Sequence, residues 1–229
     1  MLFQWTRLGL NQFRLLERRT PLPSGEPSYV LKTFTLNSTA NPRYAAIIYA
    51  ISENPEEARN ESVVLNGRSF SVTPTALEVL KKVEENKGEG YEYLWIDALC
   101  INHKDEAEKR NQEGVVERIF ESADMVIAAL PVDTPELDAF CTQARAVGNG
   151  SANESMSFGD SPAFSEFLRL GQLVGGQQIW SKQGTISASK IVLYAGRERF
   201  NAEEVSEIFG ACQKSQEEGS QSKSKESSL

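Results

Sequence analysis

Residues 94–120 read LWIDALCINHKDEAEKRNQEGVVERIF, and they carry the strongest structural signal in the chain. It opens inside Tyr91–Asp97, a short apolar run that ends on a carboxylate, which predicts a buried strand. Asp105–Ala123 follows with apolar residues at helical spacing, and Met125–Leu130 is a second buried apolar run. A strand, a helix and a strand at this spacing form a βαβ unit, so we expect an α/β fold with a partly parallel sheet flanked by helices.

The residues upstream extend this pattern. Tyr44–Ile51 is a nearly continuous apolar run, as expected for a strand that is covered on both faces. Asn66-Gly67 lies between two short apolar runs and predicts a type I′ hairpin, since both residues accept positive φ. Thr73 followed by Pro74 predicts the start of a helix. We therefore expect a β-hairpin inserted into the α/β fold.

Composition shifts divide the chain into parts. We expect an N-terminal extension over 1–40 and an α/β domain over 41–212, with a polar surface loop near 148–161. After that loop the pattern predicts a helix near Pro162–Val174, a strand at Lys190–Ala195 and a helix at Asn201–Gln213. Residues 213–229 hold almost no large apolar side chain, so we expect a disordered tail.

The composition excludes several function classes. The 229 residues include 24 basic and 32 acidic side chains, and a net charge of −8 argues against non-specific nucleic-acid binding. No apolar run approaches the roughly 20 residues that span a bilayer, and we expect a cytoplasmic protein. Three widely spaced cysteines and a single histidine, His103, favour neither a disulfide framework nor a metal site.

Asp97 and Glu108 are the carboxylates that this segment places near a possible site. Asp97 ends a predicted strand, and ligands of open α/β sheets bind at the carboxyl ends of the strands. The alternative is that Asp97 bonds backbone N–H groups of the next turn. Asp105 and Glu108 form a D-x-x-E pattern that favours helix capping. Cys100, between apolar neighbours, is interpreted as a small core residue rather than a nucleophile.

The same segment resembles the central motif of the fungal heterokaryon-incompatibility (HET) domain, LWIDAxCINQxDxxERxxQVxxMxxIYxxA. Tyr44–Tyr49 resembles the family's YxALSYxWG strand, and the hairpin with the helix after it resembles IxxNGxxxxVTxNLxxAL. Trp180–Gly184 falls where the family has WxxQE. The resemblance covers about residues 44–196. It implies a role in fungal non-self recognition, in which activation kills incompatible fused cells.

HET domains are similar to TIR domains, so the resemblance implies a flavodoxin/TIR-like fold and cleavage of NAD⁺ at the nicotinamide–ribose bond. A carboxylate near that bond would stabilise the oxocarbenium-like transition state. NAD⁺ would then be a substrate, and no cofactor or metal is required. The implied site residues are Asp97 and Glu108 as catalytic candidates, with NAD⁺ contacts from Tyr49, Trp95, Asn102 and Trp180.

The sequence departs from the family pattern at the implied site. Gly184 stands where the family motif supplies glutamate, and Ile51-Ser52 replaces Trp-Gly. Glu198 is another carboxylate that could substitute, or it could simply be solvated. Two main hypotheses follow: a cell-death effector that cleaves NAD⁺, or a non-enzymatic module that pairs with intact HET or TIR-like partners. Self-association suits both, and binding of a small nucleotide without chemistry is a third possibility.

Overall fold

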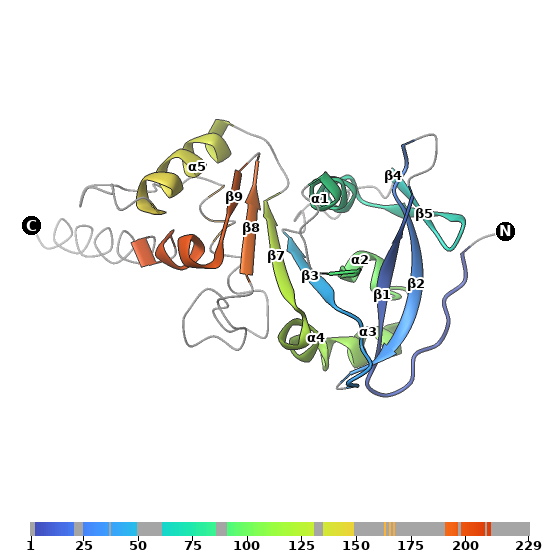
Figure 1. Cartoon of the computed structure of the whole chain (residues 1–229). Helices are drawn as coiled ribbons and strands as arrows, with labels where there is room; N and C mark the ends of the chain where they lie inside the picture. The colour runs from blue at the N-terminus through green and yellow to red at the C-terminus, as the bar shows by residue number, and fades with distance from the viewer. Residues whose placement is uncertain are drawn as a thin grey trace, which may run out of the picture. The chain divides into compact units, whose positions relative to one another are not determined.

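The computed structural model describes residues 3–20, 25–36, 38–49, 61–85, 91–130, 135–148, 163, 165, 167, 191–196, 198–208, 210 and 211. The chain divides into two compact units, Met1–Pro131 and Val132–Leu229 (Figure 1). Each unit is described by itself.

The first unit is built on a mixed sheet with the strand order β5-β4-β2-β1-β6-β3-β7. Strand β3 runs parallel to both β6 and β7, whereas β1 runs antiparallel to β2 and β6. The predicted α/β class and the partly parallel sheet are therefore confirmed. The strands are β1 (Gln12–Arg19), β2 (Ser28–Thr35), β3 (Tyr44–Tyr49), β4 (Glu61–Leu65), β5 (Arg68–Val72), β6 (Tyr93–Trp95) and β7 (Met125–Leu130).

Four helices belong to the described residues of this unit: α1 (Pro74–Glu85), α2 (Asp97–Cys100), α3 (Glu106–Glu113) and α4 (Val116–Ser122). The prediction of one long helix over Asp105–Ala123 was wrong, because α3 ends at Glu113 and α4 begins at Val116, with Gly114 and Val115 between them. Glycine costs a helix interior about 1 kcal/mol, which favours a break there. The strand predicted over Tyr91–Asp97 was too long, since Asp97 already begins α2.

The hairpin and the helix after it match the prediction. Asn66 has a φ of 52° and Gly67 a φ of 73°, the positive values that a type I′ turn requires. They join β4 to β5 with Leu65 opposite Arg68. The Thr73 hydroxyl accepts a hydrogen bond from the Ala76 N–H at 3.2 Å and so caps α1. The apolar side chains of α1 are buried.

Two strands, β1 and β2, lie in the segment that the sequence suggested to be an extension. They pair along their whole length, from Gln12 opposite Thr35 to Arg19 opposite Ser28. β1 also pairs with β6, so it lies inside the sheet rather than at its margin. Phe13, Leu15 and Leu16 of β1 are fully buried. The N-terminal residues therefore supply part of the core of this unit.

The second unit contains α5 (Pro135–Gly148), β8 (Ile191–Ala195), β9 (Glu198–Phe200) and helical residues at 202–208. β8 confirms the predicted strand and pairs antiparallel with β9, and the predicted C-terminal helix is confirmed over 202–208. Sequence reasoning missed α5. The predicted tail 213–229, residues 149–161 of the predicted loop and most of the helix predicted near 162–174 lie outside the described residues.

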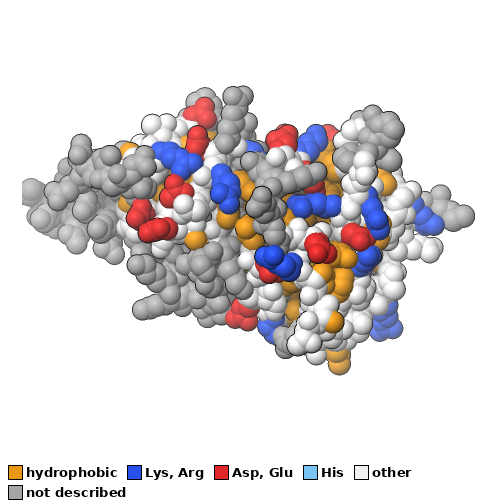
Figure 2. Space-filling model, in the orientation of Figure 1, with side chains coloured by type: hydrophobic (Ala, Val, Ile, Leu, Met, Phe, Trp, Pro, Cys, Tyr) orange, Lys and Arg blue, Asp and Glu red, His pale blue; other side chains and the backbone are white. Residues whose placement is uncertain are grey.

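Charges of both signs are interleaved on the face of the protein shown in Figure 2, without a continuous basic area. On β1, the Glu17 carboxylate pairs with Arg19 at 2.5 Å and with Lys32 of β2 at 2.9 Å. Exposed pairs of this kind contribute little stability, about 0–1 kcal/mol. Among the described helices, none is long and apolar enough to cross a membrane.

Candidate functional site

Glu108 is the carboxylate at the centre of the candidate site, and it is held by Arg14 from β1. The Arg14 Nη1 atom lies 2.6 Å from Glu108 Oε1, and Nη2 lies 2.9 Å from Oε2, so the pair is bidentate. Both side chains are buried, with 2% and 7% of their surfaces exposed. A charge removed from water this completely is costly unless it is paired, and this geometry pairs both charges.

The Arg14 guanidinium also ties other segments to the pair. Its Nη1 donates to the Cys100 carbonyl at 2.9 Å, and its Nη2 donates to the Thr6 carbonyl at 2.5 Å. The Trp5 ring covers the guanidinium at 4.7 Å, within the range of a cation–π contact. β1, α2, α3 and the segment before β1 therefore meet at one arginine.

Glu108 does not complete the capping pattern that the sequence suggested. Asp105 caps α3 as predicted, since its carboxylate accepts from the N–H groups of Ala107 and Glu108. Glu108 Oε1 accepts from the Asn102 N–H at 2.7 Å instead of from the Asp105 N–H. The Glu108 carboxylate thus fixes the turn between α2 and α3 rather than the first turn of α3.

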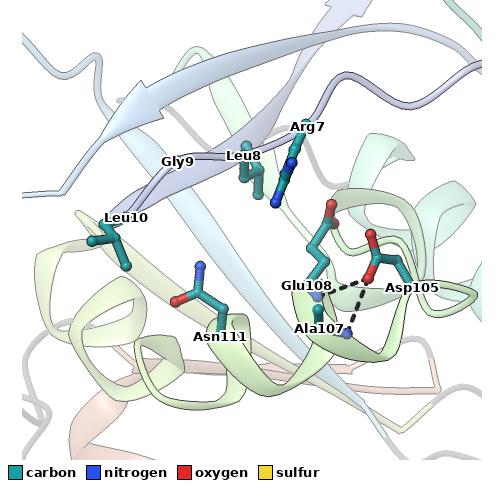
Figure 3. A pocket seen from close by; sticks show the side chains of 8 residues that line it. All are labelled: Arg7, Leu8, Gly9, Leu10, Asp105, Ala107, Glu108 and Asn111. Atoms are coloured by element: carbon teal, nitrogen blue, oxygen red, sulfur yellow. Dashed lines mark hydrogen bonds between the residues drawn. The ribbon is translucent and has the colours of Figure 1, made fainter.

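A hollow of about 820 Å³ separates α3 from the segment before β1. Arg7, Leu8, Gly9 and Leu10 line one side, and Asp105, Ala107, Glu108 and Asn111 line the other (Figure 3). Leu10 is 85% exposed, so the hollow is open to water at that end. Its volume lies in the range of small-molecule sites, but its walls are mixed in charge and polarity.

Asp97 and Tyr49 both lie at the carboxyl edge of parallel strands, because Tyr49 ends β3 and Asp97 follows β6 by two residues. The Asp97 Oδ1 atom accepts from the Ala98 N–H at 2.7 Å. This bond fits the alternative in which Asp97 bonds the following turn. The His103 Nε2 atom lies 3.1 Å from the Asp97 carbonyl oxygen, so His103 belongs to the same turn.

The structure does not bring Tyr49 and Trp95 to the same side of the sheet. Trp95 pairs with Ala46, and Tyr49 lies three residues beyond Ala46 on β3. Since side chains alternate along a strand, the two aromatic rings point to opposite faces. Trp95 is buried and packs edge-on against Phe120 of α4 at 5.3 Å. Its Nε1 atom is buried without a hydrogen-bond partner among the described residues.

The other predicted site residues are distributed as follows. Asn102 is half-buried, and its Oδ1 atom accepts from the Lys104 N–H at 3.3 Å. Trp180 and Gly184 lie outside the described residues. Glu198 lies in the second unit, where its carboxylate pairs with Arg145 at 2.8 Å. Nothing in the part of the chain that the structure describes gathers three or more metal-ligating His, Cys, Asp or Glu side chains.

Gln112 adds a second link between α3 and β1. The residue is fully buried, and its Nε2 atom donates to the Gln12 carbonyl at 2.8 Å. Glu108 and Gln112 lie four residues apart on α3, so the same helical face contacts β1 through both side chains. The two side chains thus hold α3 against β1 at Arg14 and at the Gln12 carbonyl.

Arg14 is the residue of this site that sequence reasoning missed. In the sequence Arg14 lies close to Arg18 and Arg19, a pattern that indicates no more than a weak basic patch. The available signal was the lone charge inside Phe13–Leu16, because a charged residue among apolar neighbours of a strand needs a buried partner. The sequence alone does not say which of the 32 acidic residues that partner is.

Cys100 is a core residue, as predicted. Its side chain is fully buried, and burial raises the pKa of the thiol from its ordinary value to about 12. At about pH 8 the reactive thiolate should be roughly a thousandfold rarer than in an unperturbed thiol. Iodoacetamide should therefore leave Cys100 unmodified in the folded chain and modify it in urea, as located by peptide mass spectrometry. Rapid modification in the folded chain would contradict the buried placement.

The mixed sheet with the buried Arg14–Glu108 ion pair beside it places the first unit in the class of small α/β domains. The family model for the heterokaryon incompatibility protein (HET) matches residues 44–184, more than half of the chain. The chain therefore belongs to the heterokaryon incompatibility (HET) family. No curated protein and no solved structure gives a significant match.

Proposed function

We propose that this chain acts in the cytoplasm in fungal non-self recognition and the associated cell death. In this proposal it works by binding: it associates with itself or with an intact HET or TIR-like partner. Its scaffold would be related to the NAD⁺-cleaving TIR domains while its own catalytic motif is degenerate. Membership of the HET family supports the biological role.

The observation that carries the binding proposal is the state of Glu108. Its two carboxylate oxygens accept three hydrogen bonds, from both Nη atoms of Arg14 and from the Asn102 N–H. A carboxylate that stabilises an oxocarbenium-like transition state must direct its charge at the substrate. Glu108 directs its charge at Arg14, so we assign it a structural role.

A second candidate function is NAD⁺ cleavage with Asp97 as the carboxylate. The favouring observation is its position at the carboxyl edge of β6, beside the parallel strand that ends on Tyr49. Gly184 weakens this candidate, because loss of one stabilising group typically costs about 10²–10³ in rate.

Nicotinamide released from NAD⁺ by the purified chain distinguishes the two functions. We expect no release above the blank at any protein concentration, and a gain for Gly184→Glu if position 184 corresponds to the family's glutamate. Release by the native chain that is lost in Asp97→Asn would overturn the binding proposal in favour of catalysis. Glu113→Gln, which changes an exposed carboxylate of α3, is the matched control.

A further inference from the structure

Another cavity lies at the far end of β1, which starts beside α3 and ends beside α1 (Figure 1). Its volume is about 260 Å³, and Arg18, Lys81, Glu84 and Glu85 are among the residues that line it. Since β1 runs antiparallel to β6, this end of β1 lies at the amino edge of β6, whereas Asp97 follows the carboxyl edge. The cavity is thus distinct from the site described above. It is also smaller than the roughly 300–1,000 Å³ of typical small-molecule pockets, which suits a small ion.

Arg18 is held in place but uses only one of its three side-chain nitrogen atoms. Its Nε donates to Glu84 Oε1 at 3.0 Å, and its guanidinium lies 4.7 Å over the centre of the Tyr91 ring. Nη2 is buried without a hydrogen-bond partner, and Nη1 forms no bond to any described residue either. A positive group that is partly removed from water needs acceptors for its N–H groups, so the unused nitrogens of this guanidinium favour an anion.

Lys81 and Glu85 are the other groups of this cavity that can bond a ligand. They lie four residues apart on α1, which puts them on one face of the helix. Both are exposed, and neither forms a hydrogen bond or an ion pair with a described residue. Glu84 differs, because its Oε1 already accepts from Arg18 and from the Tyr29 hydroxyl at 3.3 Å. The cavity therefore offers two cationic donors and one free carboxylate.

This mixture of charges discriminates among small oxyanions. Arg18 and Lys81 can donate to any of them, whereas Glu85 repels an anion whose oxygens carry no hydrogen. The last turn of α1 carries the negative end of the helix dipole, which acts in the same direction as Glu85. Hydrogen phosphate keeps one P–O–H group at neutral pH, and that group can donate to a carboxylate. Sulfate and the dianion of a phosphomonoester carry the same charge without a hydrogen to donate.

We propose that this cavity binds inorganic hydrogen phosphate. The Arg18 guanidinium and the Lys81 ammonium donate to its unprotonated oxygens, and Glu85 accepts from its P–O–H group. Arg19 also lines the cavity, but its Nη2 already pairs with Glu17. The inference does not rest on the proposed function, since none of these residues belongs to the candidate site.

Calorimetric titration of the full chain at about pH 8 and one ionic strength tests the selectivity. The probes are inorganic phosphate, sulfate and methyl phosphate, which carry the same charge at this pH, although only inorganic phosphate keeps a hydrogen. We expect phosphate to bind with a dissociation constant of about 1 mM or below, and the other two to bind about tenfold more weakly or worse. The amide signals of Arg18 and Lys81 in an NMR spectrum should shift with the same dissociation constant.

Substitutions at the three contacts test each of them. Arg18→Lys keeps the positive charge beside Glu84 but removes both Nη groups, so phosphate should bind about tenfold more weakly. Glu85→Gln removes the repulsion, so sulfate and phosphate should bind with similar dissociation constants. Lys81→Met should weaken phosphate binding by about twofold to fivefold. Lys104→Met, which removes an exposed lysine from the turn before α3, is the matched control and should leave binding unchanged.

Three results would overturn the phosphate site. The first is the absence of saturable phosphate binding. The second is equal binding of the three anions, because only general charge attraction would then be acting. The third is an equal effect of Lys81→Met and Lys104→Met, since both lower the net charge by one. If circular dichroism shows that Arg18→Lys is unfolded, the substitutions of the exposed Lys81 and Glu85 still decide the question.

Discussion

Replacing Glu108 with alanine is expected to lower the free energy of unfolding by about 3–5 kcal/mol, because Arg14 would remain buried without a counter-charge. The same change would remove the acceptor of the Asn102 N–H. Urea denaturation followed by circular dichroism measures the effect. Domains of this size have a free energy of unfolding of only about 5–15 kcal/mol, so the substitution would remove a large part of it.

Glu113→Ala is the matched control for this substitution. Glu113 lies on the same helix and is exposed, so its replacement should change the free energy of unfolding by less than about 0.5 kcal/mol. Equal changes in the free energy of unfolding for the two substitutions would mean that the buried ion pair adds no more stability than an exposed glutamate does. Loss of stability confined to Glu108→Ala would support the structural role.

Deleting residues 1–43 is expected to abolish cooperative unfolding, although these residues precede the family match. The deletion removes β1, with the fully buried Phe13, Leu15 and Leu16, and Arg14. Burial of each such apolar side chain contributes about 1.5–3 kcal/mol, so together they approach the whole stability of a domain. Denaturant titration and the dispersion of amide signals in an NMR spectrum measure the loss.

The control is a chain that keeps residues 1–43 but ends at residue 212. The sequence predicts a disordered tail beyond that point, so this truncation should unfold like the full chain. A fragment 44–229 that unfolds cooperatively, with a midpoint near that of the full chain, would contradict the place of β1 in the core.

The elements that the sequence predicted well are those with a strong local signal. β3 is buried along its length, as its apolar run required, and Asn66-Gly67 forms the turn that its two residues favour. The apolar residues of α1 repeat at helical spacing and are buried. In each case a few neighbouring residues carry the information.

The elements that were missed depend on distant partners. β1 contains four charged residues among its eight, and a strand with that composition has no clear alternation. Two of its charges are explained by partners on other elements, because Arg14 pairs with Glu108 of α3 and Glu17 pairs with Lys32 of β2. The break between α3 and α4 had a local signal in Gly114, but a single glycine does not always end a helix.

The candidate site was predicted only in part for the same reason. The sequence marked residues 94–120 as the informative segment, and that segment supplies two of the buried polar side chains, Glu108 and Gln112. It could not show that Glu108 faces Arg14, because 94 residues separate the two in the chain. It also could not show that Tyr49 and Trp95 lie on opposite faces, since the register between β3 and β6 decides this.

The coupling free energy between Arg14 and Glu108 tests most directly the claim that the glutamate of the family motif is structural here. A double-mutant cycle with Arg14→Met, Glu108→Leu and the double variant gives this value from three unfolding free energies and that of the native chain. We expect a coupling above about 2 kcal/mol, with the double variant more stable than either single variant. A coupling near zero would contradict the structural role, and Glu108 would again be a candidate catalytic carboxylate for NAD⁺ cleavage.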